Sequence, residues 1–218
     1  MATSPETDPR LPEVAEGTSN LAVFAATRLE AWAARRALPR GMTVERIGVG
    51  LRGWAPPAAR PFVSCGLAGA LSESLTPGTI VVPEWVGVPS GDRVRCHPPL
   101  VEALVAASRM LGREPVTAPL ITTSWLVTGR ERQDWSAKGF VAADMETGLL
   151  LNWHSCGAAV RVVLDSPQRD LSATWERPWR ALLEPWLWPQ AFWIGLTAPT
   201  YALRAAAVVR AATALTSR

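Results

Sequence analysis

Short apolar runs that alternate with segments of helical periodicity constrain the fold of this chain more than any other feature of its sequence. Five runs have the length and apolar character of buried strands, at residues 20–27, 61–71, 77–86, 116–127 and 158–165. Three segments between them repeat apolar residues at helical spacing, at residues 28–38, 99–112 and 145–157. The run at 61–71 is expected to begin as a buried strand and to break into a turn at its glycines. The alternation predicts an α/β fold with a mixed or largely parallel sheet, helices on both faces, and ligands beyond the carboxyl ends of the strands.

The chain is long and apolar enough to form one sizeable domain. Its 218 residues are 48% hydrophobic, which argues against a disordered protein. We expect a disordered tail at residues 1–19, a globular domain at residues 20–170, and a Trp-rich helical extension at residues 171–218 that packs on the domain or on a membrane surface. The tail is polar and acidic, and it lacks the basic and apolar regions of a secretion signal.

Charge and cysteine content exclude several classes of protein. The formal net charge is +3 with a pI near 9.1, but the arginines are dispersed, so no nucleic-acid partner is expected. Cys65, Cys96 and Cys156 are far apart and lack the spacing of zinc ligands or of a disulfide framework. The sequence therefore predicts a cytoplasmic protein without a metal site.

Two acids stand in the apolar segment "VAADMETGLLL" (141–151), where Asp144 and Glu146 flank Met145. An ionised acid without a partner is costly in an apolar core, because burial removes its hydration. These acids therefore either face water or have a function.

Four segments, taken in order, resemble the nucleoside phosphorylase and nucleosidase superfamily. They are "FAATRLEA" (24–31), "SCGLAGAL" (64–71) followed by "PGTIVVPE" (77–84), "DMET" (144–147) and "RVVLD" (161–165). The resemblance extends over about residues 20–170, and within the superfamily it is nearest to the hopanoid-associated phosphorylases, which are assigned to the removal of adenine from adenosylhopane. It implies a three-layer α/β phosphorylase/hydrolase-like fold with a mixed central sheet.

The resemblance also implies roles for individual residues. Asp165 takes the position of the acid that protonates the departing purine, a role that requires a raised pKa or a proton shared with the base. Glu146 takes the position of the carboxylate that holds the 2′ and 3′ hydroxyls of the ribose, with Met145 packed on the sugar. Trp125 lies near the position of a residue that contacts the base. Asp144 is expected to cap the following helix.

The nucleophile separates hydrolysis from phosphorolysis. Glu30 matches the glutamate with which hydrolytic members activate water, and a carboxylate repels phosphate, so water is the favoured nucleophile. Arg28 and Arg52 stay open as ligands for phosphate as a co-substrate, and neither route requires a metal or an organic cofactor. Backbone amides of the glycine-containing segment could cradle water or phosphate, and this segment comprises Gly66, Leu67, Ala68 and Gly69.

Each of these residues also has a purely structural interpretation. A glutamate on a first helix, such as Glu30, is ordinarily a solvated surface residue. Gly66 and Gly69 could merely permit a tight turn, and Asp165 could cap the turn that begins at "DSP". Trp125 could be an ordinary core residue. The order of the four segments favours the catalytic interpretations.

The C-terminal quarter is unusually rich in tryptophan, and no residue from 185 to 203 is charged. Its length approaches that of a membrane span, but Pro189 and Pro199 argue against one. Tryptophan favours the boundary between membrane and water, so peripheral contact with the inner membrane is expected, which would suit a nucleoside tethered to a triterpenoid. A dimer interface or core packing is the competing interpretation, and the family implies a homodimer.

The sequence thus predicts an enzyme that cleaves the N-glycosidic bond of a purine nucleoside, with water attack on adenosylhopane as the favoured reaction. Phosphorolysis of the same bond is one alternative. A salvage nucleosidase for methylthioadenosine or S-adenosylhomocysteine is another. A non-catalytic module that binds a nucleoside or a lipid is the third.

Overall fold

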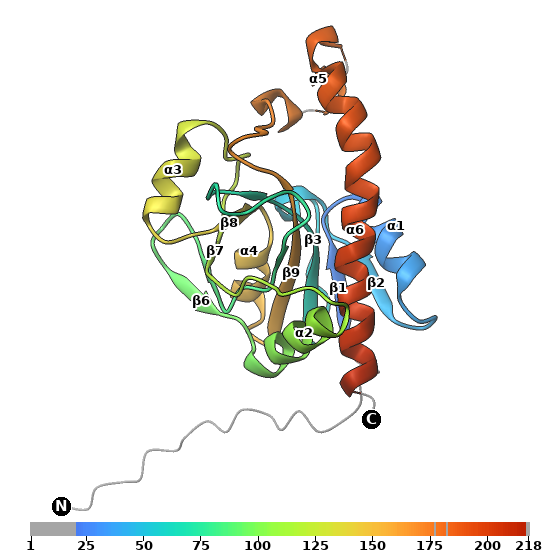
Figure 1. Cartoon of the computed structure of the whole chain (residues 1–218). Coiled ribbons are helices and arrows are strands. Elements are labelled where there is room, and N and C mark those ends of the chain that lie inside the picture. The colour runs from blue at the N-terminus through green and yellow to red at the C-terminus, as the bar shows by residue number, and fades with distance from the viewer. Residues whose placement is uncertain (1–20, 177, 182, 217–218) are drawn as a thin grey trace, which may run out of the picture.

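The computed structural model describes residues 21–176, 178–181 and 183–216, which form a mixed β-sheet with helices against both faces (Figure 1). The strands are β1 (Ala22–Ala25), β2 (Thr43–Arg46), β3 (Phe62–Ala70), β4 (Ile80–Val81), β5 (Trp85–Gly87), β6 (Arg93–Arg95), β7 (Leu120–Thr122), β8 (Ala142–Asp144) and β9 (Gly157–Asp165). The α-helices are α1 (Arg28–Ala37), α2 (Pro98–Met110), α3 (Arg130–Ala137), α4 (Thr147–Trp153), α5 (Pro178–Ala181) and α6 (Trp188–Thr216). Short 3₁₀ turns are η2 (Val49–Leu51), η3 (Ala173–Glu176) and η4 (Pro185–Leu187). The tail expected at residues 1–19 lies outside the described residues.

The sheet runs in the order β2-β1-β3-β8-β7-β5-β6, and β9 pairs with both β3 and β4. β3 and β9 form its longest pair, which is parallel and runs from Phe62 opposite Gly157 to Gly69 opposite Asp165. The pairs β3–β8, β4–β9 and β5–β6 are antiparallel, so the sheet is mixed as predicted. The parallel pairing brings the carboxyl ends of β3 and β9 to the same edge.

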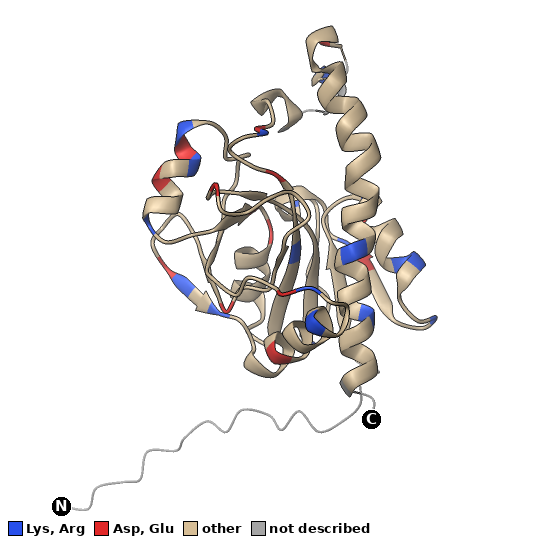
Figure 2. Cartoon of the chain, viewed as in Figure 1, with Lys and Arg blue, Asp and Glu red and all other residues tan. Residues whose placement is uncertain are grey.

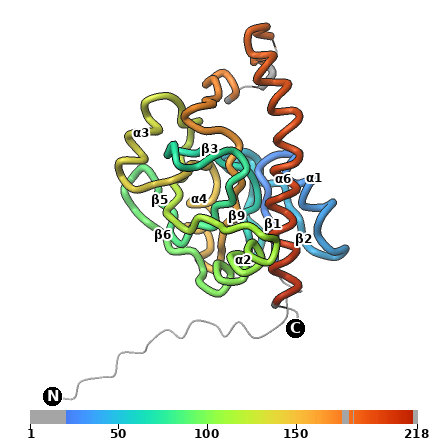
Figure 3. Tube along the Cα trace, in the orientation of Figure 1, coloured from blue at the N-terminus to red at the C-terminus, as the bar shows by residue number. Residues whose placement is uncertain are grey.

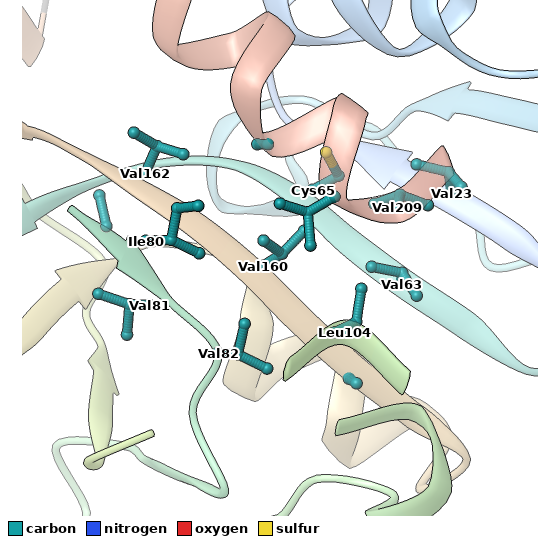
Figure 4. Packing of buried hydrophobic residues seen from close by; sticks show 14 of the residues in the cluster. Val23, Val63, Cys65, Ile80, Val81, Val82, Leu104, Val160, Val162 and Val209 are labelled. Carbon is teal, nitrogen blue, oxygen red and sulfur yellow. The ribbon is translucent and has the colours of Figure 1, made fainter. Parts of the chain in front are cut away.

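Helices α1, α2 and α6 lie together on one face of the sheet, while α4 packs on the other (Figures 1 and 3). The main core lies between β3, β9 and the first of these layers, and Figure 4 shows Val63, Val160, Leu104 and Val209 meeting there. These aliphatic side chains come from two strands and two helices. Their burial explains why the apolar runs at β3 and β9 were readable as strands.

The sequence predicted α1, α2 and β9 within a residue or two of their bounds, but it was wrong about residues 61–71. β3 continues as a strand through Gly66 and Gly69, so no turn forms at these glycines. A β-carbon at Gly66 would lie 2.2 Å from Oε1 of Glu30, and one at Gly69 would lie 3.1 Å from Oδ1 of Asp165. The two glycines therefore provide space for neighbouring side chains and do not bend the chain.

Two other predicted strands are shorter than expected. The run at 77–86 divides into β4 and β5 around Pro83, which has no N–H to donate to a ladder. Within 116–127 only Leu120–Thr122 is a strand, and it follows Pro119. The sequence analysis did not anticipate β2, β6, β8 or α3.

The two halves of α6 differ in charge and in burial. The charged residues of this helix lie in its C-terminal half, as Figure 2 shows. In its C-terminal half, Ala205, Val208 and Val209 are fully buried in the main core. In its N-terminal half and just before it, several large apolar side chains are 60–74% exposed: Leu183, Trp186, Trp188, Phe192 and Leu196. By length and composition alone, the stretch Pro185–Leu215 could cross a membrane, although about a third of its most apolar window is buried in the protein.

Candidate active site

The start of α1 places Glu30 inside the protein. Thr27 is the N-cap, and its hydroxyl accepts a hydrogen bond from the backbone N of Glu30 at 3.2 Å. Oε2 of Glu30 in turn accepts hydrogen bonds at 2.8 Å from the backbone N and the hydroxyl of Thr27, which completes a capping box. Glu30 is only 5% exposed, so its interpretation as a solvated surface residue is wrong.

Glu30 also reaches the glycine-containing segment of β3. Its Oε1 accepts a hydrogen bond from the backbone N of Leu67 at 2.8 Å. A β-carbon at Gly66 would collide with this carboxylate and would lie 2.6 Å from Nη1 of Arg161. Gly66 therefore allows a carboxylate and a guanidinium to approach the same point of the strand.

Arg161 organises the acids of the "DMET" segment from the middle of β9, where it is fully buried. Its Nη2 lies 2.6 Å from Oδ2 of Asp144 and 3.5 Å from Oε2 of Glu146. The same nitrogen donates to the hydroxyls of Ser64 at 2.8 Å and Thr147 at 2.9 Å. We call these five residues the Arg161 cluster. No role was predicted for Arg161, although a lone charge in the apolar strand β9 indicates either a buried partner or a function.

Asp144 contacts the start of the following helix but is not its N-cap, which is Glu146. Its Oδ2 accepts a hydrogen bond at 3.2 Å from the backbone N of Thr147, the first residue of α4. Its Oδ1 accepts one from the hydroxyl of Thr122 at 2.5 Å. Asp144 thus fixes α4 and the end of β7 around Arg161.

Glu146 is buried beside this pair and has one further contact. Its Oε1 accepts a hydrogen bond at 3.1 Å from the backbone N of Gly50, in the loop that contains η2. Burial raises the pKa of Glu146 to about 8, with Arg161 acting to lower it and Asp144 and Glu30 acting to raise it. Arg161 is the one cation of this cluster, and Asp144 is the acid that lies nearer to it. Met145, between the two acids, is partly buried.

Asp165 ends β9 in a second buried group. It is 2% exposed and forms an ion pair with Nη2 of Arg132, from α3. Arg132 is equally buried, lies 2.8 Å from Oδ1 of Asp170, and donates through Nη1 to the carbonyl of Ala70. Burial raises the pKa of Asp165, and the guanidinium of Arg132 acts against that rise. We call Arg132, Asp165 and Asp170 the Arg132 cluster.

Arg132 and Asp170 were missed by the sequence analysis. Both lie outside the four segments that resemble the superfamily, and Arg132 is the one buried residue of α3. Such a helix has no apolar stripe, so its sequence carries no periodic signal. Nothing in the pattern around Asp170 marks it as the partner of a residue 38 positions earlier.

Trp125 lies in the loop between β7 and α3 and is 37% exposed, so it is not a core residue. Its Nε1 donates a hydrogen bond to Oε1 of Glu131 at 2.8 Å, which attaches this loop to α3.

Arg28 and Arg52, the two candidate phosphate ligands, are both exposed. Within the described ranges, no three His, Cys, Asp or Glu side chains gather as metal ligands.

The two clusters lie along one strand. The Arg161 cluster meets β3 at Gly66, and the Arg132 cluster meets it at Gly69, with Leu67 and Ala68 between them. Three residues of strand separate these points by roughly 10 Å. The two buried groups therefore approach the same strand at neighbouring points, where β8 and β9 flank β3.

Comparison with known proteins identifies the fold. No protein-family model and no curated protein matches the sequence. Among solved structures, the chain is similar to a 5′-methylthioadenosine/S-adenosylhomocysteine nucleosidase from Neisseria meningitidis, with 16% identity, 91% of this chain and 99% of that chain covered, and a TM-score of 0.66. The fold is that of nucleosidases and nucleoside phosphorylases. Futalosine hydrolase of Helicobacter pylori (10% identity, 89% and 97% covered, TM-score 0.68) and purine nucleoside phosphorylase from Toxoplasma gondii (16% identity, 92% of both chains covered, TM-score 0.66) share it.

Proposed function

We propose that this protein is an enzyme that cleaves the N-glycosidic bond of a purine nucleoside. The observation that carries the proposal is the pair of buried acids, Glu146 and Asp165, whose pKa values are both raised by burial and which belong to separate clusters along β3. Perturbed carboxyl groups at the carboxyl end of sheet strands are typical of acid–base sites. The fold, shared with nucleosidases and a nucleoside phosphorylase, is consistent with this chemistry.

Asp165 is the proposed acid. Cleavage of the bond between C1′ of the ribose and a purine nitrogen leaves negative charge on the base, and a proton from Asp165 would neutralise it. A raised pKa keeps such a proton available closer to neutral pH than an ordinary aspartate would.

Glu146 is the proposed ligand of the ribose hydroxyls, with Met145 against the sugar. Its Oε1 accepts a hydrogen bond from the backbone N of Gly50, so a ribose hydroxyl would join or replace that donor. A carboxylate held next to Arg161 can hold the ring rigidly and place negative charge beside the oxocarbenium-like transition state. Trp125 is the proposed contact to the base.

Water is the proposed nucleophile, activated by Glu30. The water oxygen would form the new bond to C1′ as the bond to the base breaks, with one water proton passing to Glu30 and the proton of Asp165 passing to the base. The N–H of Leu67 already donates to Glu30, so within the glycine-containing segment this amide is engaged by a carboxylate. That contact disfavours phosphate at the same place, because the anion and the carboxylate would repel each other.

Adenosylhopane is the proposed nucleoside, which would make this a step of hopanoid biosynthesis. The exposed apolar residues of Leu183 to Leu196 offer a surface for a lipid layer, and the sequence from 185 to 203 carries no charge that would resist contact with it (Figure 2). Gln190 on this half of α6 donates to the carbonyl of Asp170 at 3.3 Å and accepts from Trp175 at 2.8 Å. The apolar surface is therefore attached to the segment that follows Asp165. We propose a cytoplasmic homodimer that contacts the inner membrane peripherally.

A second candidate is salvage of methylthioadenosine or S-adenosylhomocysteine. It is favoured by the similarity to the nucleosidase of Neisseria meningitidis, whose structure contains methylthio-immucillin-A. In that case the exposed apolar residues of α6 would serve subunit association.

Adenine release from adenosylhopane and from methylthioadenosine, each with and without phosphate, tests these proposals. Release from adenosylhopane alone supports the lipid-linked substrate, and release from methylthioadenosine supports the salvage reaction. Dependence on phosphate would remove Glu30 as the base for water. Binding of either nucleoside without release of adenine, unchanged in Glu146→Gln, would indicate a non-catalytic binding module.

A further inference from the structure

We propose that Arg132 is the positioning residue for Asp165 and that Asp170 holds Arg132 in place for that role. The inference rests on the proposed function, in which Asp165 protonates the leaving base. It adds to that function two residues that orient this carboxyl group and set its proton affinity.

Each nitrogen of the Arg132 guanidinium has an acceptor. Nη2 contacts Asp165 and Asp170, Nη1 donates to the carbonyl of Ala70, and Nε donates to Oδ1 of Asp170 at 3.0 Å. All three of its nitrogens are thus engaged, and the side chain is 1% exposed. A planar guanidinium fixed by three acceptors fixes in turn the carboxyl group that it contacts.

Asp170 connects this cation to the start of α3. Its Oδ2 accepts a hydrogen bond at 2.6 Å from the backbone N of Gly129, the N-cap of α3, while its Oδ1 binds Arg132. One carboxylate therefore holds both the end of the helix and the buried arginine that the helix supplies. The side chain of Asp170 is 30% exposed, so this attachment faces solvent on one side.

The two charged groups around Asp165 act on it in opposite directions. Arg132, from α3, favours the ionised carboxylate, whereas Asp170, from the segment after β9, disfavours it. Arg132→Met and Asp170→Asn should therefore change the proton affinity of Asp165 in opposite directions. This opposition gives the proposal a test that loss of stability cannot imitate.

The test compares Arg132→Met and Asp170→Asn with the unmodified protein. The exposed pair of Arg109, on α2, with Glu114 supplies a matched control, Arg109→Met, in which an arginine is removed from an exposed acid. The carboxyl carbon of Asp165 is titrated by NMR in ¹³C-labelled, substrate-free protein and assigned by its disappearance in Asp165→Asn. The pH profile of adenine release is measured with methylthioadenosine or adenosylhopane, whichever is cleaved.

Removal of the cation in Arg132→Met leaves burial unopposed, so the midpoint of Asp165 is expected to rise by roughly 1–3 pH units. An acid works in its protonated form, and the fall of activity at high pH should therefore move upward while the maximal rate drops because the carboxyl is no longer aimed. Asp170→Asn keeps an amide oxygen that can still accept from Arg132 but removes a negative charge near Asp165, so it should move the midpoint downward by a smaller amount. Arg132→Lys keeps the charge, so its midpoint should stay closer to normal while the rate still falls.

Midpoints that stay at the normal value in both Arg132→Met and Asp170→Asn would overturn the proposal, as would shifts of the same sign. Should Arg132→Met not fold, the downward shift in Asp170→Asn still decides the matter. The NMR titration needs no activity, so it separates this inference from the proposed function. If Asp165→Asn keeps full activity, the acid role of Asp165 fails, whatever the titration shows.

Discussion

The two buried arginines of this protein hold their acids in different ways. Arg161 projects from the middle of β9, and its partners lie on β3, β8 and α4 or at the start of that helix. Arg132 comes from the short helix α3, and one of its two acids, Asp170, is partly exposed in a connecting segment. The first cluster is therefore built into the sheet, while the second joins the sheet to elements at its edge.

The difference indicates which cluster the fold depends on. Asp144 and Glu146 have no other cation within the Arg161 cluster, and both are buried. In the Arg132 cluster, Asp165 alone is deeply buried, since Asp170 can be hydrated. We infer that the Arg161 cluster mainly determines stability, and that the Arg132 cluster mainly determines the chemistry of Asp165.

The largest expected effect is the loss of stability in Arg161→Met. Two buried acids would lose their cation, and the free energy of unfolding should fall by about 3–5 kcal/mol, as when one partner of a buried ion pair is removed. Urea denaturation measures this loss. The free energy of unfolding should fall by less in Arg132→Met, and in Arg109→Met it should equal that of the unmodified protein. Equal losses in the two buried variants would break the contrast between the clusters.

The next largest effect is on turnover in Asp165→Asn. The amide cannot give up a proton to the base, so adenine release should fall by about a hundredfold or more. Initial rates of adenine release measure this, with the melting temperature as a check on folding. Turnover near the normal value would remove Asp165 from the mechanism.

The two glycines of β3 test how tightly each cluster is packed. In Gly66→Ala the new methyl group would meet the carboxylate of Glu30 at 2.2 Å, so that the acid or Arg161 must move, at a cost of about 1–3 kcal/mol. Gly69→Ala meets its nearest atoms at 3.1 Å, where a small shift of Arg132 is sufficient. Thermal unfolding and adenine release should both be impaired more in Gly66→Ala than in Gly69→Ala.

Gly195→Ala is the matched control for these glycine variants. It lies in the exposed half of α6, and apart from the neighbouring backbone of its own helix no atom lies within 4 Å of its new methyl group. Alanine there should stabilise the protein by about 0.5–1 kcal/mol, because glycine is unfavourable inside a helix. A greater loss in Gly69→Ala than in Gly66→Ala would reverse the assignment of the tighter contact.

The sequence could predict the first cluster better than the second, for physical reasons. Asp144, Glu146 and Asp165 interrupt apolar runs, and an acid in such a place signals either a partner or a function. Arg161 likewise interrupts the apolar run "AAVRVVLD" and carries the same signal. Arg132 and Asp170 lie in polar stretches where a buried charge looks like any exposed one.

The fold, too, could be predicted only in part. Long apolar runs predicted β3, β9, α1 and α2, but strands of three or four residues, such as β6 and β8, are too short to show a period. The glycines of β3 were misjudged because turns are the commoner reason for glycine after a strand, and only the three-dimensional positions of Glu30 and Asp165 reveal the need for space.

The remaining prediction concerns the pH dependence of stability, and it tests whether Glu146 is the protonated acid of the Arg161 cluster. Its pKa is about 8 in the folded protein against an ordinary value of 4.5, so between these values the folded state holds a proton that the unfolded state has released. Stability contributed by this group is therefore present below pH 4.5 and is lost as pH rises toward 8. The slope is at most about 1.4 kcal/mol per pH unit, the value for one proton. Glu146→Gln cannot ionise and should therefore remove this decline. Between pH 5 and pH 8, roughly the titration window, the free energy of unfolding of Glu146→Gln should increase relative to that of the unmodified protein. Parallel curves for the two proteins would mean that Glu146 is ionised throughout, and that Arg161 balances two carboxylates at once.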